Sequence, residues 1–424
     1  MNYNKNPDKS TWIELLKRPT FDTKSLEERV LPVLKKVKEE GDQALKQFTL
    51  EFDKVQLTSF LVSDSEIKNA ETLVSLELKN AINIARVNIE KFHLLQREEV
   101  KKVETSSGVF CWRKSVPISK VGLYIPGGTA PLFSTILMLG VPANIAGCEE
   151  IILCTPPNKS GEVHPAILYT ASILGIKKIF KVGGAQAIAA MAYGTETIPQ
   201  VYKIFGPGNQ YVMAAKQLVS KEGTAIDMPA GPSEVAVLVD ESCIPAFAAS
   251  DLLAQAEHGV DSQVILVGTN EKVLEEIQKE VSIQLEQLSR KEFAAKALEN
   301  SKVIVVKDLE LAMELINLYA PEHLILQVKD VDKCASMVKN AGSVFLGNYT
   351  PESAGDYASG TNHTLPTNGY ARAYSGVSLD SFVKKITFQH ISKEGIRNLG
   401  PTIEIMAEAE QLDAHKNAVS LRIK

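Results

Sequence analysis

The sequence predicts an α/β protein made of two parallel-sheet units, with a helical part before them and a helical tail after them. Apolar residues recur at three- and four-residue spacing through residues 25–100, as in helices that bury one face. From about residue 117, short β-branched runs alternate with helix-length amphipathic stretches, which favours sheets covered on both faces. There are nine such runs, more than one sheet usually holds. We therefore expect two units, divided near residue 235 by the loop DMPAGPSE.

The expected elements follow in chain order. VLPVLKKVKEEGDQALKQF and ELKNAINIARVNIEKFHLL carry the helical spacing of the first part. The expected strands are residues 121–125, 150–154, 178–182, 201–205, 234–239, 263–267, 302–306, 323–328 and 343–347. We expect no strand after about residue 350, where a long polar loop (351–376) begins, and long ordered loops are often functional. A last helix is expected from about Pro401 to Asn417.

Composition argues against several classes of partner. The chain has 424 residues, of which 45% are hydrophobic and 23% charged, as in an ordinary globular protein with a large core. The net charge of -5 offers no electrostatic reason to expect nucleic acid or an anionic membrane. The five cysteines have no metal or redox spacing, which fits buried thiols in a reducing compartment. The N-terminus lacks an apolar signal core, so we expect a cytoplasmic protein.

Four of the seven histidines lie in polar clusters of the second half: His258, His323, His363 and His415. The other three lie in amphipathic or loop contexts and are expected to be structural: His93, His164 and His390. The polar clusters are therefore the places to look for chemistry.

A metal site is one interpretation of the first cluster. Gln255 and His258 are three residues apart on an expected helix, so they share a face. An imidazole beside a carbonyl or carboxylate oxygen suits a borderline metal such as zinc. Two such residues are nevertheless more often a solvated polar pair. Asp356 from the long loop and His415 from the last helix could complete a mixed nitrogen and oxygen set, but spacing cannot show that they converge.

The segment YAPEHLI places Glu322 and His323 at the start of an expected strand. Pro321 disfavours a helical Ala320, so the preceding helix should end there. A carboxylate beside an imidazole is a plausible general-base set, because histidine titrates near neutral pH. The alternative is a pair of polar residues exposed at a sheet edge.

Three glycine-rich turns precede residue 210, although the chain has no G-x-G-x-x-G motif. Each joins an expected strand to an expected helix: VGLYIPGGTAPLFS (121–134), KVGGAQAIAAMA (181–192) and KIFGPGNQYVMAAK (203–216). Free amides at a helix N-terminus favour phosphate. The turns therefore indicate nucleotide binding in the first unit, with tight packing turns as the alternative.

The chain resembles the histidinol dehydrogenase family along its whole length. The matching stretches are GLYIPGG, APLFSTILML, VGGAQAIAA, KIFGPGN, AIDMPAGPSEV, DLLAQAEHG, DSQVIL, PEHL, AGSVFLG, PESAGDYASGTNHTLPT and AHKNAV. The resemblance implies a homodimeric zinc enzyme that oxidises L-histidinol to L-histidine through L-histidinaldehyde and reduces two NAD. It also implies two incomplete Rossmann-like domains, of residues 21–101 with 121–235 and of residues 236–376. Residues 1–20 with 102–120 would form a small accessory domain, and the tail 377–424 would reach the partner subunit.

The resemblance also implies a role for particular residues. Glu322 and His323 would be the catalytic acid/base pair. The zinc ligands would be Gln255, His258, Asp356 and His415. The substrate would contact these four, His323, Ser233, His363 and Glu410. NAD would contact Tyr124, Gln186 and Asn209.

Two other functions remain possible at this stage. A zinc hydrolase could use Glu322 and a metal-bound water, but this leaves the glycine turns without a purpose. A non-catalytic metal- or nucleotide-binding protein would not need four polar histidine motifs.

Overall fold

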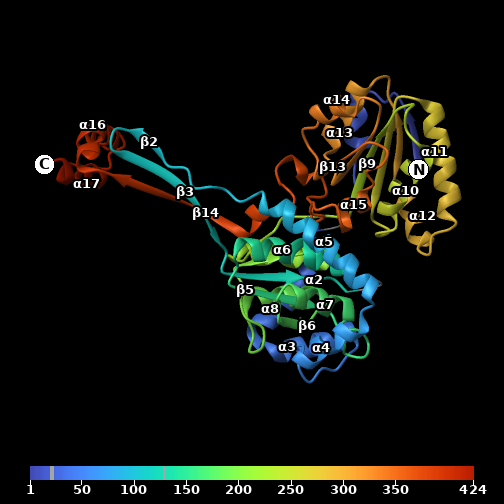
Figure 1. Ribbon diagram of the computed structural model, residues 1–424, viewed down its shortest axis with the longest axis horizontal. Coiled ribbons are helices and arrows are strands. Elements are labelled where there is room, and N and C mark those ends of the chain that lie inside the picture. The colour runs from blue at the N-terminus through green and yellow to red at the C-terminus, as the bar shows by residue number, and fades with distance from the viewer. Residues whose placement is uncertain (20–22, 128–129) are drawn as a thin grey trace.

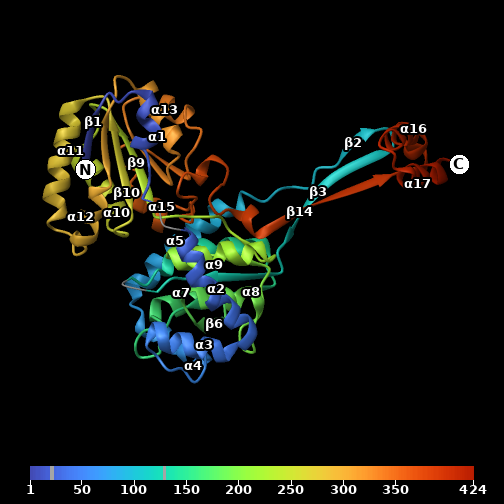
Figure 2. The same cartoon turned by 180° about the vertical axis from the view of Figure 1, so that it is seen from behind.

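The computed structural model describes residues 1–19, 23–127 and 130–424. Two α/β lobes lie side by side, and a long arm projects away from them (Figure 1, Figure 2). The N-terminus lies in the second lobe, and the C-terminus lies at the far tip of the arm. The structure has two parallel sheets, helices before the first of them and a helical tail after the second. The predicted α/β fold class is therefore confirmed. Within the described ranges, no helix has the length and apolar character needed to cross a membrane.

The helices of the N-terminal part cover the first lobe, as the spacing predicts. They are α2 (Thr23–Glu40), α3 (Asp42–Phe48), the π-helix η2 (Thr49–Asp53), α4 (Asp64–Leu73) and α5 (Leu76–Leu94). Gly41, at φ 54°, separates α2 from α3. The hydroxyls of Ser63 and Ser75 accept backbone N–H groups at the starts of α4 and α5 and so cap these helices.

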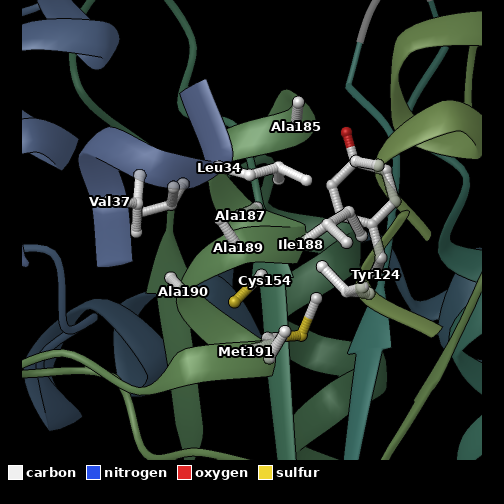
Figure 3. Packing of buried hydrophobic residues seen from close by; sticks show 14 of the residues in the cluster. Leu34, Val37, Tyr124, Cys154, Ala185, Ala187, Ile188, Ala189, Ala190 and Met191 are labelled. Atoms are coloured by element: carbon white, nitrogen blue, oxygen red, sulfur yellow. The ribbon is translucent and has the colours of Figure 1, made fainter. Parts of the chain in front are cut away.

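The first lobe holds a five-stranded parallel sheet in the order β6-β5-β4-β7-β8. Its strands are β4 (Lys120–Tyr124), β5 (Glu150–Thr155), β6 (Lys178–Lys181), β7 (Lys203–Phe205) and β8 (Ala225–Ile226). Its own helices are α6 (Phe133–Ala146), α7 (Pro165–Ile173), α8 (Gly184–Tyr193) and α9 (Gln210–Lys221). Counted from β4, the strand order is 3-2-1-4-5, so the winding reverses between β4 and β7. On one face α2 and α8 pack over Tyr124 and Cys154 (Figure 3).

The second lobe repeats this order with β11-β10-β9-β12-β13 and adds β1 (Asn2–Lys5) beside β11. Its strands are β9 (Glu234–Val239), β10 (Gln263–Gly268), β11 (Lys302–Val305), β12 (His323–Gln327) and β13 (Ser343–Leu346). Val235 and Val237 pack toward one set of helices: α10 (Pro245–Ala256), α11 (Glu271–Leu285) and α12 (Lys291–Glu299). Ala236 and Leu238 pack toward the other: α1 (Trp12–Leu15), α13 (Leu309–Tyr319) and α14 (Val331–Ser336). All nine predicted strands are therefore confirmed.

The arm contains the strand and helices that the sequence misplaced. A strand does follow residue 350: β14 (Val383–Ile391) pairs antiparallel with β3 (Val109–Pro117), which pairs with β2 (Val103–Ser106). The single helix expected from Pro401 is in fact two, α16 (Lys393–Ala409) and α17 (Asp413–Ile423). Ser392 caps α16 well before Pro401, and Gln411 takes a left-handed φ of 60° that separates the helices.

The strand pairing separates β1 from the segment 103–117, both of which were expected in the accessory domain. β1 runs parallel to β11 in the second lobe, whereas residues 103–117 pair within the arm. β1 therefore lies in a different sheet from β2 and β3, and the bounds of the accessory domain stay a prediction. β1 pairs with β11 over its whole length at the edge of the second-lobe sheet. Local strand propensity cannot reveal a pairing between segments so far apart in the sequence.

Candidate active site

The two lobes present opposite strand ends to a shared cavity. In the second lobe, Ser233 precedes β9, His258 precedes β10, and His323 opens β12, so all lie at amino ends. In the first lobe, the glycine turns follow the carboxyl ends of β4, β6 and β7, where α/β sheets usually bind ligands. A cavity of about 420 Å³ is lined from both sides, by Asn209 of the first lobe and by Ser233 and His258 of the second.

The YAPEHLI segment turns sharply from α13 into β12. Ala320 ends α13 in the left-handed region at φ 54°, directly before Pro321, which confirms the predicted helix end. Arg18 stabilises this turn by donating hydrogen bonds to the carbonyl oxygens of Tyr319 at 2.6 Å and Ala320 at 3.3 Å. The same guanidinium forms a two-point ion pair with Glu234, at 2.5 and 2.8 Å.

The turn brings the side chains of Glu322 and His323 together in the interior. They are 6% and 3% exposed, so the alternative of an exposed polar pair is wrong. Glu322 Oε2 accepts the backbone N–H of Glu234 at 2.9 Å and lies 3.8 Å from His323 Nδ1. His323 Nε2 lies 3.5 Å from Asp356 Oδ1. A Cβ on Gly342 would lie 2.6 Å from the Glu322 carbonyl oxygen, so this close approach requires glycine.

Burial and neighbouring charge shift the pKa values of both Glu322 and His323. Burial raises the pKa of Glu322 to about 8, and the adjacent His323 opposes that rise. Burial alone would lower the pKa of His323, but the carboxylates of Glu352, Glu322 and Asp356 outweigh it and raise that pKa well above its usual range. Shifts of this kind, in groups packed side by side, are typical of acid/base sites.

A group of ligand-type atoms lies next to this pair. His258, Glu352 and Asp356 each contribute one such atom, and these atoms all lie within 4.8 Å of one another. Glu352 and Asp356 are four residues apart on α15 (Glu352–Tyr357) and share its inner face. Gln255, at the end of α10, is fully buried, and neither its amide oxygen nor its nitrogen has a hydrogen-bond partner. A buried amide without partners is costly, so these residues fit a cation in their midst.

Sequence reasoning missed Glu352 and Arg18. Glu352 lies in PESAGDY, four residues before Asp356, and that helical spacing was the available signal. No local pattern indicated Arg18, because its contacts are distant along the chain. Its partner in the turn, Tyr319, is about three hundred residues away, and Glu234 is about two hundred residues away.

His363 links the long loop to the first lobe. Its Nδ1 lies 3.0 Å from the Asp356 carbonyl oxygen, and its Nε2 lies 3.2 Å from the Thr135 hydroxyl in α6. Within one chain, however, Glu410 and His415 do not join the site. Both are exposed, Glu410 at the end of α16 and His415 in α17, and these two helices form the tip of the arm, far from α15 in either view (Figure 1, Figure 2).

A second, larger cavity of about 1230 Å³ is lined in part by Tyr124, Gln186 and Asn209, which belong to the three glycine-rich segments. The Tyr124 hydroxyl accepts the Gly184 N–H at 3.0 Å. Asn209 Oδ1 accepts two backbone N–H groups, at 3.1 Å each, and so caps α9. Asn209 lines both cavities, so they adjoin at this residue.

Gly206 shows why the turn after β7 needs glycine. Its φ is 128°, and a Cβ there would lie 2.0 Å from the Tyr124 carbonyl oxygen. The turns after β4 and β7 therefore approach each other at the point where the strand order reverses.

A sequence model of histidinol dehydrogenase matches residues 16–423. The chain belongs to the histidinol dehydrogenase family. It is 64% identical to histidinol dehydrogenase of Bacteroides thetaiotaomicron over 99% of this chain and 98% of the relative. It is 53% identical to the chloroplastic histidinol dehydrogenase of Arabidopsis thaliana, over 98% of this chain and 90% of that one.

A crystal structure of histidinol dehydrogenase from Elizabethkingia anophelis is similar throughout, with a TM-score of 0.98 and 57% identity. That similarity covers 100% of this chain and 98% of the other. The family assignment therefore spans both lobes and the arm, and it confirms the resemblance that the motifs indicated.

Proposed function

We propose that the chain catalyses the zinc-dependent, NAD-linked oxidation of L-histidinol to L-histidine through L-histidinaldehyde. Membership of the histidinol dehydrogenase family makes it an oxidoreductase of histidine biosynthesis. The observation that supports this site is the buried Glu322–His323 pair, whose imidazole lies 3.5 Å from Asp356 in the ligand-type cluster. His258 of that cluster lines a cavity that reaches the glycine turn at Asn209.

We assign the metal to Gln255, His258 and Asp356, with His415 supplied by a second copy. The unpartnered amide of Gln255 and the close approach of His258 to Asp356 support this assignment. Two imidazoles, a carboxylate and an amide oxygen form a ligand set that suits zinc and leaves room for substrate nitrogens. When bound, zinc would hold the imidazole and amine of histidinol and so orient its alcohol carbon.

NAD is assigned to the larger cavity, where it would accept one hydride in each of two steps. Tyr124, Gln186 and Asn209 are the proposed contacts, and all three line that cavity. Asn209 lies where the two cavities adjoin, so a nicotinamide near it could face a substrate near His258. A hydrolase would have no use for this second cavity.

The two buried acid/base groups have different proposed roles. In the first step, His323 removes the proton of the alcohol. In the second step, Glu322 removes a proton from the water that adds to the aldehyde, and His323 then deprotonates the resulting hydrate. The raised pKa of Glu322, about 8, makes its carboxylate a stronger base than an exposed one. Water is the proposed nucleophile because, among the described residues, no cysteine lines either cavity.

The remaining proposed contacts hold the substrate. Ser233 lines the smaller cavity, and His363 lies at the junction of the two lobes. Glu410 and His415 would reach the site from a second copy of the chain.

A homodimer would also cover the arm. Its tip exposes large apolar side chains, with Ile405 68%, Met406 61% and Leu421 61% accessible. Such a cluster on a thin projection is expected to be buried by a partner. We propose that the arm docks on a second copy, that sites are shared, and that the enzyme works in the cytoplasm.

The test is NADH formation from L-histidinol by the purified chain, followed by absorbance. We expect turnover that a chelator abolishes and added zinc restores. Absence of NADH formation by a zinc-loaded, dimeric sample would refute the proposed function.

A further inference from the structure

Glu352 is a buried carboxylate that the mechanism above does not use. It opens α15 and is 1% exposed. Its Oε1 lies 3.8 Å from His323 Nδ1, and its Oε2 has no hydrogen-bond partner. A buried carboxylate is costly unless it has a partner, so its position beside the imidazole needs a reason.

The two nitrogens of His323 face different surroundings. Nε2 points to Asp356, which is on the metal and substrate side of the site. Nδ1 faces two carboxylates, Glu322 and Glu352, each at 3.8 Å. An imidazole acts as a base through one nitrogen when the other donates its proton to a fixed acceptor, and that acceptor sets the tautomer and the ring orientation.

Glu352 is better placed than Glu322 to be that acceptor. Glu322 Oε2, its atom nearest His323, already accepts the Glu234 N–H, and Glu322 has a proposed task on water. Asp251 lies beside both Glu352 and the strand of His323, and the nearby backbone N–H of Glu352 opposes the rise that burial causes in the pKa of Asp251. The Asp251 carboxylate also accepts the side-chain amide of Gln327, at the far end of β12, at 2.9 Å.

We propose that Glu352 is a positioning residue for His323: it accepts the Nδ1–H and thereby directs Nε2 toward the substrate. The proposal rests on the function proposed above. The present separation is 3.8 Å, and we expect it to shorten to hydrogen-bond length in the substrate complex, because catalytic contacts of this kind often tighten when substrate binds. Because His323 acts in both steps, Glu352 supports both.

The experiment measures kcat and KM of the zinc-loaded dimer with L-histidinol and, separately, with L-histidinaldehyde. Glu352→Gln should lower kcat roughly 10- to 100-fold for both substrates, with KM and zinc content unchanged. Glu352→Ala, which also loses the acceptor oxygen, should fall further. Glu257→Gln makes the same chemical change beside the cluster without facing His323, so its kcat should equal that of the unmodified enzyme.

Each contrary outcome has a definite meaning. A loss confined to one substrate, a change in KM alone, or an unaltered kcat would overturn the positioning role. Zinc loss in parallel with kcat would make Glu352 a metal ligand instead, since it lies in the ligand-type group. An unmodified enzyme that is inactive on L-histidinol would refute the proposed function, whereas an active enzyme with an unaffected Glu352→Gln variant would refute only this inference.

Discussion

The buried ion pair between Arg18 and Glu234 is expected to stabilise the turn that leads into Glu322 and His323. The two side chains are 12% and 2% exposed, and two contacts join them. Arg18→Met keeps much of the apolar stem but leaves Glu234 charged, buried and unpaired. It also removes the donor to the carbonyl oxygens of Tyr319 and Ala320.

The expected cost follows from that burial. Removing one partner of a buried ion pair costs roughly 3–5 kcal/mol, because the remaining charge has lost both water and its counter-ion. Both side chains are well under a third exposed, so solvent screening gives little relief. The double variant Arg18→Met with Glu234→Met should recover much of the loss, because it leaves no buried charge.

Tryptophan fluorescence can isolate the lobe concerned. The chain has two tryptophans: Trp12 is 4% exposed in the core of the second lobe, and Trp112 stacks on Phe388 in the arm. In a Trp112→Phe background, urea denaturation followed by Trp12 reports the second lobe alone. Lys333→Met is the control, because it breaks an ion pair in the same lobe whose side chains are 57% and 55% exposed.

The control should leave the unfolding transition unchanged within error. A loss for Arg18→Met no larger than that of the control would refute the assignment of a buried, coupled pair. So would a double variant that is as unstable as Arg18→Met alone.

Four further predictions address the chemistry and the assembly. Glu322→Gln should impair oxidation of the aldehyde far more than that of the alcohol in steady-state kinetics, and equal losses would contradict the division of roles. His258→Asn should lower zinc content and activity together, and full metal retention would remove it from the ligand set. His323→Asn and His415→Asn should each be inactive alone but regain activity in mixed dimers, since one site then has both intact residues; no recovery would argue against shared sites. Burial raises the pKa of Asp53 from 3.8 to about 6, so its contribution to folding stability is full below pH 3.8 and is lost as pH rises through about 6. Asp53→Asn should therefore flatten thermal stability across that range, and an unchanged profile would exclude Asp53 as the cause.

Much of the fold could be predicted because its signals are local. The nine strands that were predicted in the two lobes are continuous apolar runs between amphipathic helices, as buried parallel strands must be. The arm had no such signal. β14 is mostly exposed, and its sequence VKKITFQHI lacks the continuous apolar run that marks the buried strands of the lobes. β1 was missed for a related reason, since only its pairing with β11 gives it a place.

The sequence by itself determined the residue types available for catalysis and, through its motifs, the family to which they belong. It also determined that Pro321 would end a helix next to Glu322 and His323. Tertiary structure alone decided that this pair is buried, that Asp356 and Glu352 lie beside it, and that Arg18 holds its turn. It also placed α17, the helix that carries His415, at the tip of the arm and away from α15 of the same chain. The physical reason is that helix and strand signals act over a few residues, whereas burial, charge coupling and ligand convergence depend on contacts between segments hundreds of residues apart.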